Sequence, residues 1–268
     1  MGSAAGIGYP EDGEGPARQV ALSPFALARH CVTNADFARF VGETGYLTTA
    51  ETSGWSHVFH LLLRAELKRA AREVPAQTPW WYPVRGACWH MPEGPGSHWE
   101  GRERHPVVHV SWRDAQAYCR WSRTRLPTEA QWEYAARAGS EEAFPWGPEL
   151  TLEGRHMCNV WQGRFPGQNT AEDGFVGTAP VDAYAANAFG LSNMIGNVWE
   201  WCADWFDPQY HRTTSDRDPI RSQGTDARSA RGGSFLCHES YCNRYRLGAR
   251  TGNPPDTTCS NLGFRVAM

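Results

Sequence analysis

The stretch "RGGSFLCHESYCNRYR", residues 231–246, sets Cys237 and Cys242 five positions apart among serine, tyrosine, histidine and arginine side chains. In a strand or a loop, the two thiols converge only if the chain bends between them. A converging pair can serve as a structural disulfide, as a clamp for a metal ion, or as a redox-active pair. The rest of the sequence has to decide between these uses.

The composition around this stretch predicts a domain with little regular secondary structure. The 268 residues include 13 tryptophans, 27 glycines and 18 prolines. Tryptophan buries a large area, while frequent glycine and proline interrupt helices and strands. We therefore expect an α+β fold held together by aromatic packing and loop hydrogen bonds. The chain contains no long linker, so residues 1–268 are predicted to form a single domain.

Charge and hydropathy exclude several classes of protein. The formal net charge is −3, without a basic stripe, which argues against a nucleic-acid partner. A run of eighteen apolar residues is absent from the sequence, so we expect no membrane span. The first residues lack a secretory signal pattern, which predicts a cytoplasmic protein with free thiols. We also expect a monomer.

Three segments carry helix-capping signals. Thr33 and Ser111 are predicted N-caps, each followed three residues later by an aspartate. Thr128 and Gln131 form the pattern of a capping box, and Gly139 is placed to end that helix.

Other segments give weaker signals. Residues 58–74 are predicted to form a helix that ends at Pro75, although three consecutive leucines blur its apolar face. The apolar run that begins at His105 is expected to form a short buried strand. Three further strands are expected in the last third of the chain, within residues 229–235, 243–250 and 262–268.

The residue types around the thiol pair narrow its chemistry but leave two uses open. A disulfide between Cys237 and Cys242 would close a small loop and add little stability. Zinc prefers four nitrogen or sulfur ligands, and a second cysteine pair at suitable spacing is absent. Copper(I) fits two thiolates, which Arg244 and Arg246 would favour if they lie close. The residues themselves predict a redox-active or a copper-binding pair, and His238 lies between the two thiols.

Two loop-like segments gather oxygen ligands. Asn159 and Asp173 lie in one segment, and Asn193 and Glu200 in the other. Calcium accepts side-chain and carbonyl oxygens from irregular loops, whereas the alternative is ordinary turn chemistry of Asn and Asp. The spacing of His105 and His109 also suggests a metal pair, but the flanking proline and apolar residues favour a purely structural strand.

Four stretches together resemble the formylglycine-generating enzyme family, in the order in which that family shows them. They are "RLPTEAQWEYAARAG" (125–139), "GNVWEWCADWF" (196–206), "RGGSFLCHESYCNRYR" (231–246) and "NPPDTTCSNLGFRVA" (253–267). The similarity runs from about residue 9 to the end of the chain. The first and last stretches are typical of a wider superfamily, and "CHESYC" is the part specific to the catalytic family.

The resemblance implies a C-type-lectin-like fold and an oxidase of the bacterial aerobic type. Such an enzyme uses molecular oxygen to convert a cysteine of a newly made sulfatase, within Cys-x-Pro-x-Arg, into Cα-formylglycine. By position, Cys237 and Cys242 would hold copper(I), and the substrate thiolate would join as a third sulfur ligand. Three further positions match residues that line the family's site: Ser234, Tyr241 and Trp199.

The resemblance also implies two structural calcium sites. The first would comprise Asn159, Val160, Asp173 and Phe175, and the second would comprise Asn193, Gly196, Val198 and Glu200. The family's usual first strand, before "MGS", has no counterpart here, and we expect a less stable sheet edge. The positions of the family's disulfide partners hold Ala136, Leu247 and Val266, which leaves Cys119 unpaired. The remaining cysteines, Cys31, Cys88, Cys158, Cys202 and Cys259, are expected to be bystanders.

Two alternatives remain within the same superfamily. An iron-dependent sulfoxide synthase would need a histidine-rich iron site, which the sequence lacks. A non-catalytic lectin-like binding module would be expected to lose the thiol pair or its neighbours, whereas Cys237, Cys242, Ser234, Tyr241 and Trp199 are all present.

Overall fold

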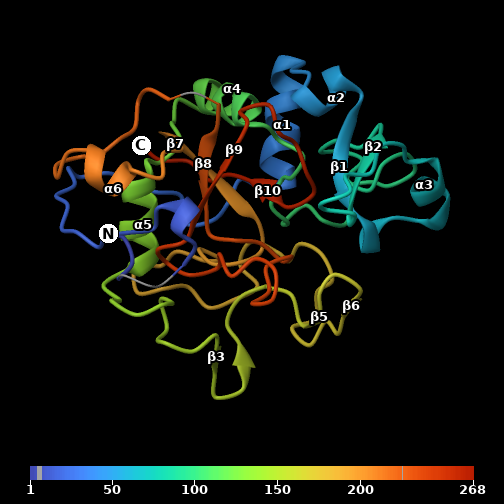
Figure 1. Ribbon diagram of the computed structural model, residues 1–268. Helices are drawn as coiled ribbons and strands as arrows, with labels where there is room; N and C mark the ends of the chain where they lie inside the picture. The colour runs from blue at the N-terminus through green and yellow to red at the C-terminus, as the bar shows by residue number, and fades with distance from the viewer. Residues whose placement is uncertain (5–7, 225) are drawn as a thin grey trace.

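A computed structural model describes residues 1–4, 8–224 and 226–268, and its centre is one mixed four-stranded sheet (Figure 1). The strand order is β10-β7-β8-β9. Strand β10 runs parallel to β7, and the other neighbours are antiparallel. The strands are β7 (Trp199–Trp205), β8 (Arg228–Arg231), β9 (Arg250–Asn253) and β10 (Leu262–Gly263).

The three predicted capped helices are confirmed. They are α1 (Asn34–Thr44), α4 (Trp112–Ser122) and α5 (Glu129–Arg137), and each begins with a capping box. Helix α5 packs against β7 and β8 and buries Trp132 completely. Its end differs by one residue from the prediction, because Ala138 takes the left-handed conformation and Gly139 follows it.

The predicted helix over residues 58–74 is wrong for its first half. Strand β1 (Trp55–Phe59) pairs in antiparallel fashion with β2 (Trp81–Arg85), and the short helices η2 (His60–Leu62) and α3 (Ala65–Ala70) lie between them. Val58 and Phe59 are fully buried, so both faces of this strand end are apolar, and the consecutive leucines continue that pattern. Residues 55–85, from β1 to β2, are called the β1–β2 excursion below. Helix α2 (Thr49–Ser53) precedes it, and the excursion lies to one side of the central sheet (Figure 1).

The strand predicted from His105 is also wrong. Residues 106–111 are buried, but they form only an isolated bridge from Pro106 to Thr33, and Trp112 already belongs to helix α4. His109 has a φ of 60°, which breaks the extended conformation. The backbone N–H groups of Val107 and His109 donate to carbonyl oxygens of two different segments, at 2.9 and 3.0 Å, so no ladder forms.

The strands expected in the last third are confirmed in part. Strand β8 ends before Gly232 and Gly233, which both have positive φ values. Residues 243–249 form no strand, and β9 begins only at Arg250. Strand β10 is limited to two residues, because the chain then leaves the sheet and makes a bridge at Ala267.

The rest of the chain has little regular structure, as the composition predicts. It contains η1 (Pro10–Asp12), α6 (Tyr210–Thr213) and two small hairpins formed by β3 (Thr151–Leu152), β4 (Arg155–His156), β5 (Gly163–Arg164) and β6 (Gln168–Asn169). Aromatic packing links the loops to the helices; Phe40, for example, contacts Phe37 and Tyr118 edge to face. Within the described ranges, none of the helices combines the length and the apolar character that crossing a bilayer requires.

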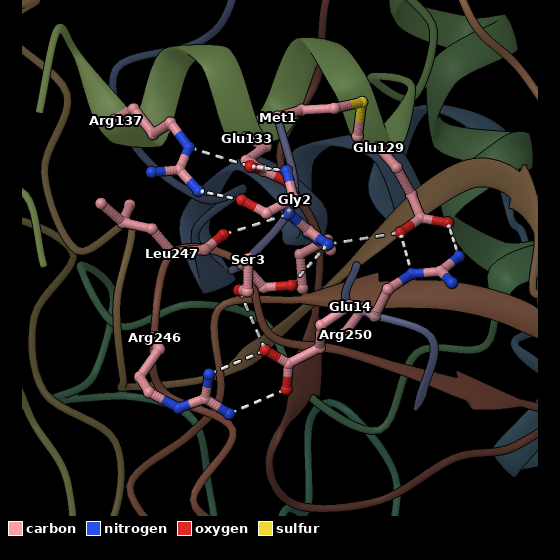
Figure 2. Close-up of polar contacts among 12 residues, drawn as sticks. Met1, Gly2, Ser3, Glu14, Glu129, Glu133, Arg137, Arg246, Leu247 and Arg250 are labelled. Atoms are coloured by element: carbon pink, nitrogen blue, oxygen red, sulfur yellow. Dashed lines mark hydrogen bonds and ion pairs between the residues drawn. The ribbon is translucent and has the colours of Figure 1, made fainter. Parts of the chain in front are cut away.

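Buried ion pairs join α5 to strands β8 and β9 (Figure 2). Arg250 donates to both oxygens of Glu129, and Arg231 contacts Glu129 and Glu133. The backbone N–H of Gly2 donates to Glu133 at 2.7 Å. All four charged side chains are inaccessible to solvent, so each charge depends on its partner. This network fixes the strands that flank the thiol segment.

Candidate active site

A cavity of 370 Å³ opens beside the end of the central sheet and contains the thiol pair. Its wall combines the segment 234–244 with residues of β7, β9, β10 and the β1–β2 excursion. All five residues predicted for the catalytic site line it: Trp199, Ser234, Cys237, Tyr241 and Cys242.

The Sγ atoms of Cys237 and Cys242 are 2.9 Å apart. A disulfide bond would be about 2.05 Å long, so the two groups are free thiols joined by a hydrogen bond. Two consecutive turns produce the bend that the sequence requires. The N–H of Cys237 donates to the carbonyl of Ser234 at 2.9 Å, and the N–H of Cys242 donates to the carbonyl of His238 at 2.8 Å. The His238 ring itself contacts Ser240 instead of the thiols.

The two thiols differ in acidity. Burial, together with the neighbouring Cys242, raises the pKa of Cys237 well above its usual value. The hydrogen bond from Cys237 and the nearby Arg244 guanidinium lower the pKa of Cys242, against the effect of burial. Cys242 is therefore the more acidic member of the pair, and Cys237 the less acidic one.

Ser234 contacts the thiol pair through Cys237. Its hydroxyl oxygen accepts a hydrogen bond from the Asn261 side chain at 2.8 Å, and Ser234 is fully buried. Because the Ser234 oxygen accepts from Asn261, the Ser234 hydroxyl proton is free to be donated to the sulfur of Cys237. This hydrogen bond lowers the pKa of Cys237 and so opposes the effect of burial. Asn261 also accepts a hydrogen bond from the N–H of Trp199 through its carbonyl, at 2.9 Å, which ties Ser234 to strand β7.

Tyr241 is held by aromatic rings on two sides. Its ring stacks on Phe165 with the centroids 4.3 Å apart and the planes within 3°. The edge of Trp80 meets it at 4.8 Å. This packing fixes the tyrosine at the rim of the cavity next to Cys242, and burial raises the pKa of its hydroxyl.

Two arginines attach the segment after Cys242 to the N-terminal part of the chain. Arg244 pairs with Asp12 through two nitrogen atoms and lies over the ring of Tyr9 at 4.2 Å. Arg246 donates to both carboxylate oxygens of Glu14, at 2.7 and 2.8 Å (Figure 2). Only Arg244 lines the cavity, so the two basic residues that the sequence suggested have different positions.

Several cavity residues were not identified from the sequence. His57 and Trp81 lie on the β1–β2 excursion, where the sequence predicted a helix from residue 58. Cys259 was expected to be a bystander but lines the cavity and contacts the side-chain oxygen of Asn261 at 3.1 Å. Asn261 and Cys259 lie in the stretch 253–267, so their proximity to that motif was the available signal.

The residues of the first predicted calcium set flank the β5–β6 hairpin along the chain. The side-chain oxygen of Asn159 is buried and lacks a hydrogen-bond partner within the part of the chain that the structure describes. Asp173 accepts from the N–H of Phe175 at 3.0 Å and from Tyr184 at 2.9 Å. The carbonyl of Val160 accepts from the side chain of Gln162, so a cation there would share this oxygen.

The second predicted calcium set is less well suited to a cation, because only some of its oxygens are free. The side-chain oxygen of Asn193 is likewise buried without a partner among the described residues. Glu200, by contrast, is already neutralised by Arg265, whose nitrogens lie 2.6 and 2.7 Å from its two oxygens, and it also accepts from Trp132. Gly196 and Val198 lie in the same buried segment.

The two histidines of the suggested metal pair have different hydrogen-bond partners. His105 contacts Thr178 through Nδ1 at 2.9 Å. His109 contacts Ser56 through Nδ1 at 2.7 Å, and burial lowers the pKa of His109 to about 3. Both rings therefore make hydrogen bonds to hydroxyl groups of other segments.

A buried thiol pair that shares a proton and faces an open cavity is the arrangement of an enzyme that works through cysteine chemistry. The sequence matches the sulfatase-modifying factor enzyme 1-like domain over residues 1–268, and the chain belongs to this family.

Individual comparisons agree with this assignment. The chain is 55% identical over 271 residues to the formylglycine-generating enzyme of Thermomonospora curvata, covering 100% of the chain and 89% of that protein. It is 45% identical over 260 residues to a mouse protein named inactive C-alpha-formylglycine-generating enzyme 2, covering 96% and 79%. The structure of PvdO from Pseudomonas aeruginosa superposes with a TM-score of 0.71 at 26% identity, covering 100% and 89%. The α+β fold is therefore the fold of this family, as predicted.

Proposed function

We propose that this chain is a copper-dependent oxidase that converts the cysteine of a Cys-x-Pro-x-Arg motif in sulfatases into Cα-formylglycine, with molecular oxygen as the oxidant. Membership of the family, with relatives named formylglycine-generating enzyme, makes the chain an enzyme of that class. The observation that carries the proposal is the pair of buried thiols, 2.9 Å apart, at the wall of the cavity.

The donor set suits copper(I). Two cysteine sulfurs are the ligands that this soft ion prefers, and the cavity leaves room for a third sulfur from the substrate. Copper bound by Cys237 and Cys242 would supply the one-electron chemistry by which dioxygen reacts with the substrate thiolate. Forming the aldehyde from the thiol with one dioxygen also requires two electrons and two protons, which an external thiol reductant provides as it becomes a disulfide. One oxygen atom enters the aldehyde, the other leaves as water, and the substrate sulfur leaves as hydrogen sulfide.

The chain's own residues would orient the substrate and move protons. The Oγ–H of Ser234, fixed by Asn261, is placed to donate to the sulfur of Cys237. Trp199 contributes an apolar ring to the cavity wall and would limit water at the reacting carbon. Tyr241, held by its aromatic neighbours, offers a hydroxyl at the rim, where the peptide backbone would pass.

The proposal includes calcium as a structural ion. The buried, unpaired oxygens of Asn159 and Asn193 are the observations that support it. At the second set, the ion would have to share Glu200 with Arg265. We also propose that the enzyme is cytoplasmic, since all eight cysteines are free, which is typical of a reducing compartment. We further propose that it acts as a monomer.

A copper(I) titration with and without peptide tests the proposal. The chain should take up one copper(I), and a Cys-x-Pro-x-Arg peptide should tighten that binding, because its thiolate adds a ligand. The matched peptide with serine in place of cysteine should have no such effect. Equal effects of the two peptides, or unchanged copper uptake by Cys237→Ala, would contradict the proposal.

A further inference from the structure

A second group of metal-ligating side chains lies outside the cavity. Glu51, Cys88 and His90 bring one oxygen, one sulfur and one nitrogen atom within 4.8 Å of one another. None of the three lines the cavity that contains Cys237 and Cys242. This group is called the Glu-Cys-His cluster below.

The carboxylate of Glu51 is already oriented. One oxygen, Oε2, accepts hydrogen bonds from the N–H and the hydroxyl of Thr48, at 2.9 and 2.6 Å, as part of the cap of helix α2. The other oxygen, Oε1, is turned toward His90 and lies 3.3 Å from its Nε2. Fixing one oxygen in this way is how ligating carboxylates are commonly held.

The other two members of the cluster lie on one tight turn. The N–H of Cys88 donates to the carbonyl of Met91 at 3.2 Å, and the N–H of Met91 donates back at 3.1 Å. Cys88 is buried, while the side chain of His90 is 37% exposed. The turn therefore brings a buried sulfur atom and a partly exposed imidazole close to the carboxylate of Glu51.

We propose that the Glu-Cys-His cluster binds a divalent cation of the zinc type, with water as the fourth ligand. Zinc accepts this mixture of oxygen, sulfur and nitrogen donors. With Zn–O and Zn–N distances near 2.05 Å, tetrahedral geometry separates an oxygen and a nitrogen ligand by about 3.3 Å. The observed spacing of Glu51 and His90 equals that value. A simple ion pair would explain these two residues, but it would give the third donor, Cys88, no role.

The position of the cluster gives the cation a structural effect on the active-site cavity. Glu51 lies on α2, where the chain enters the β1–β2 excursion, and the turn 88–91 follows where the chain leaves it. The metal would join the two ends of this excursion, which lies apart from the central sheet (Figure 1). His57, Thr78 and Trp81, which belong to the excursion, line the cavity. Metal binding would therefore make this wall of the cavity more rigid.

Cobalt(II) is the probe for the experiment, because a cobalt–thiolate bond gives an ultraviolet charge-transfer band and tetrahedral coordination gives intense visible bands. We expect the full-length chain to bind one cobalt(II) with both features, under anaerobic conditions, and zinc(II) to displace it. The charge-transfer band should disappear in Cys88→Ser. Cobalt affinity should fall by about tenfold or more in His90→Ala.

Matched variants exclude other origins of the signal. Cys242→Ser, which alters the active-site pair, should keep the cobalt bands, as should Cys119→Ala and the exposed-histidine variant His98→Ala. Absence of the bands in the wild-type chain would overturn the proposal. So would persistence of the charge-transfer band in Cys88→Ser, an unchanged cobalt affinity in His90→Ala, or loss of the bands in Cys242→Ser. Because His90 is partly exposed, His90→Ala should fold even if Cys88→Ser does not.

Discussion

Replacing Arg246 with methionine tests whether a buried ion pair holds the thiol segment in place. Arg246 lies four residues after Cys242, and its guanidinium makes two hydrogen bonds to Glu14. Only 1% of the Glu14 side chain is exposed. Arg246→Met would leave that carboxylate buried and unpaired, which costs about 3–5 kcal/mol. For a chain of this size, the melting temperature should fall on the order of 10 °C.

Urea unfolding of three variants measures this cost. The double variant Arg246→Met/Glu14→Leu should recover most of the lost stability, because a buried ion pair replaced by apolar residues of similar size is often neutral. The control is Arg155→Met, which removes a solvent-exposed pair with Glu153 and should cost less than about 1 kcal/mol. A loss below about 1 kcal/mol in Arg246→Met, or no recovery in the double variant, would refute the reasoning.

Three further predictions concern the metals and pH. Cys242→Ser should keep the circular dichroism spectrum and the melting temperature but lose copper(I) binding and turnover, because a hydroxyl is a poor ligand for a soft ion; full turnover would contradict the copper clamp. Burial lowers the pKa of His211 to about 4, below its value of 6.5 in the unfolded chain. The buried neutral ring therefore stabilises the folded state at a pH above 6.5, and this contribution is lost as the pH falls. Between about pH 7.5 and about pH 5, the wild-type chain should therefore lose about 2 kcal/mol more unfolding free energy than His211→Phe, and equal losses in urea titrations would show that His211 is not buried in its neutral form. Calcium should raise the melting temperature of the wild-type chain, with a smaller rise in Asn159→Ala and Asn193→Ala, and a melting temperature indifferent to both calcium and chelator would exclude these sites.

Local rules predicted the helices well. Thr33, Ser111 and Thr128 begin helices because their side chains accept the N–H three residues later, and that interaction depends only on neighbouring residues. The same rule applies to Thr48 and Glu51, where a helix of five residues was not recognised. A capping box therefore predicts where a helix begins but says little about its length.

Segments whose structure depends on distant partners were predicted less well. Val58 and Phe59 form a strand because they pair with Tyr82 and Trp81, more than twenty residues away. Residues 105–112 look like a strand, yet their backbone donors find partners in two separate segments. Apolar pattern alone indicates burial in both cases, and it cannot identify the hydrogen-bonding partner.

The thiol pair could be predicted from the sequence because both cysteines lie in one short stretch. Its surroundings could not be fully predicted, since Asn261 and His57 reach the cavity through tertiary contacts. The different acidities of Cys237 and Cys242 depend on burial and on Arg244, which only the folded structure provides.

Mass spectrometry of a Cys-x-Pro-x-Arg peptide, after incubation with the chain, copper, oxygen and a thiol reductant, tests the proposed reaction most directly. The account predicts a peptide aldehyde that a hydrazide traps and that is absent without copper or with Cys237→Ala. An unchanged peptide in the presence of a fully copper-loaded chain would contradict the proposed oxidation.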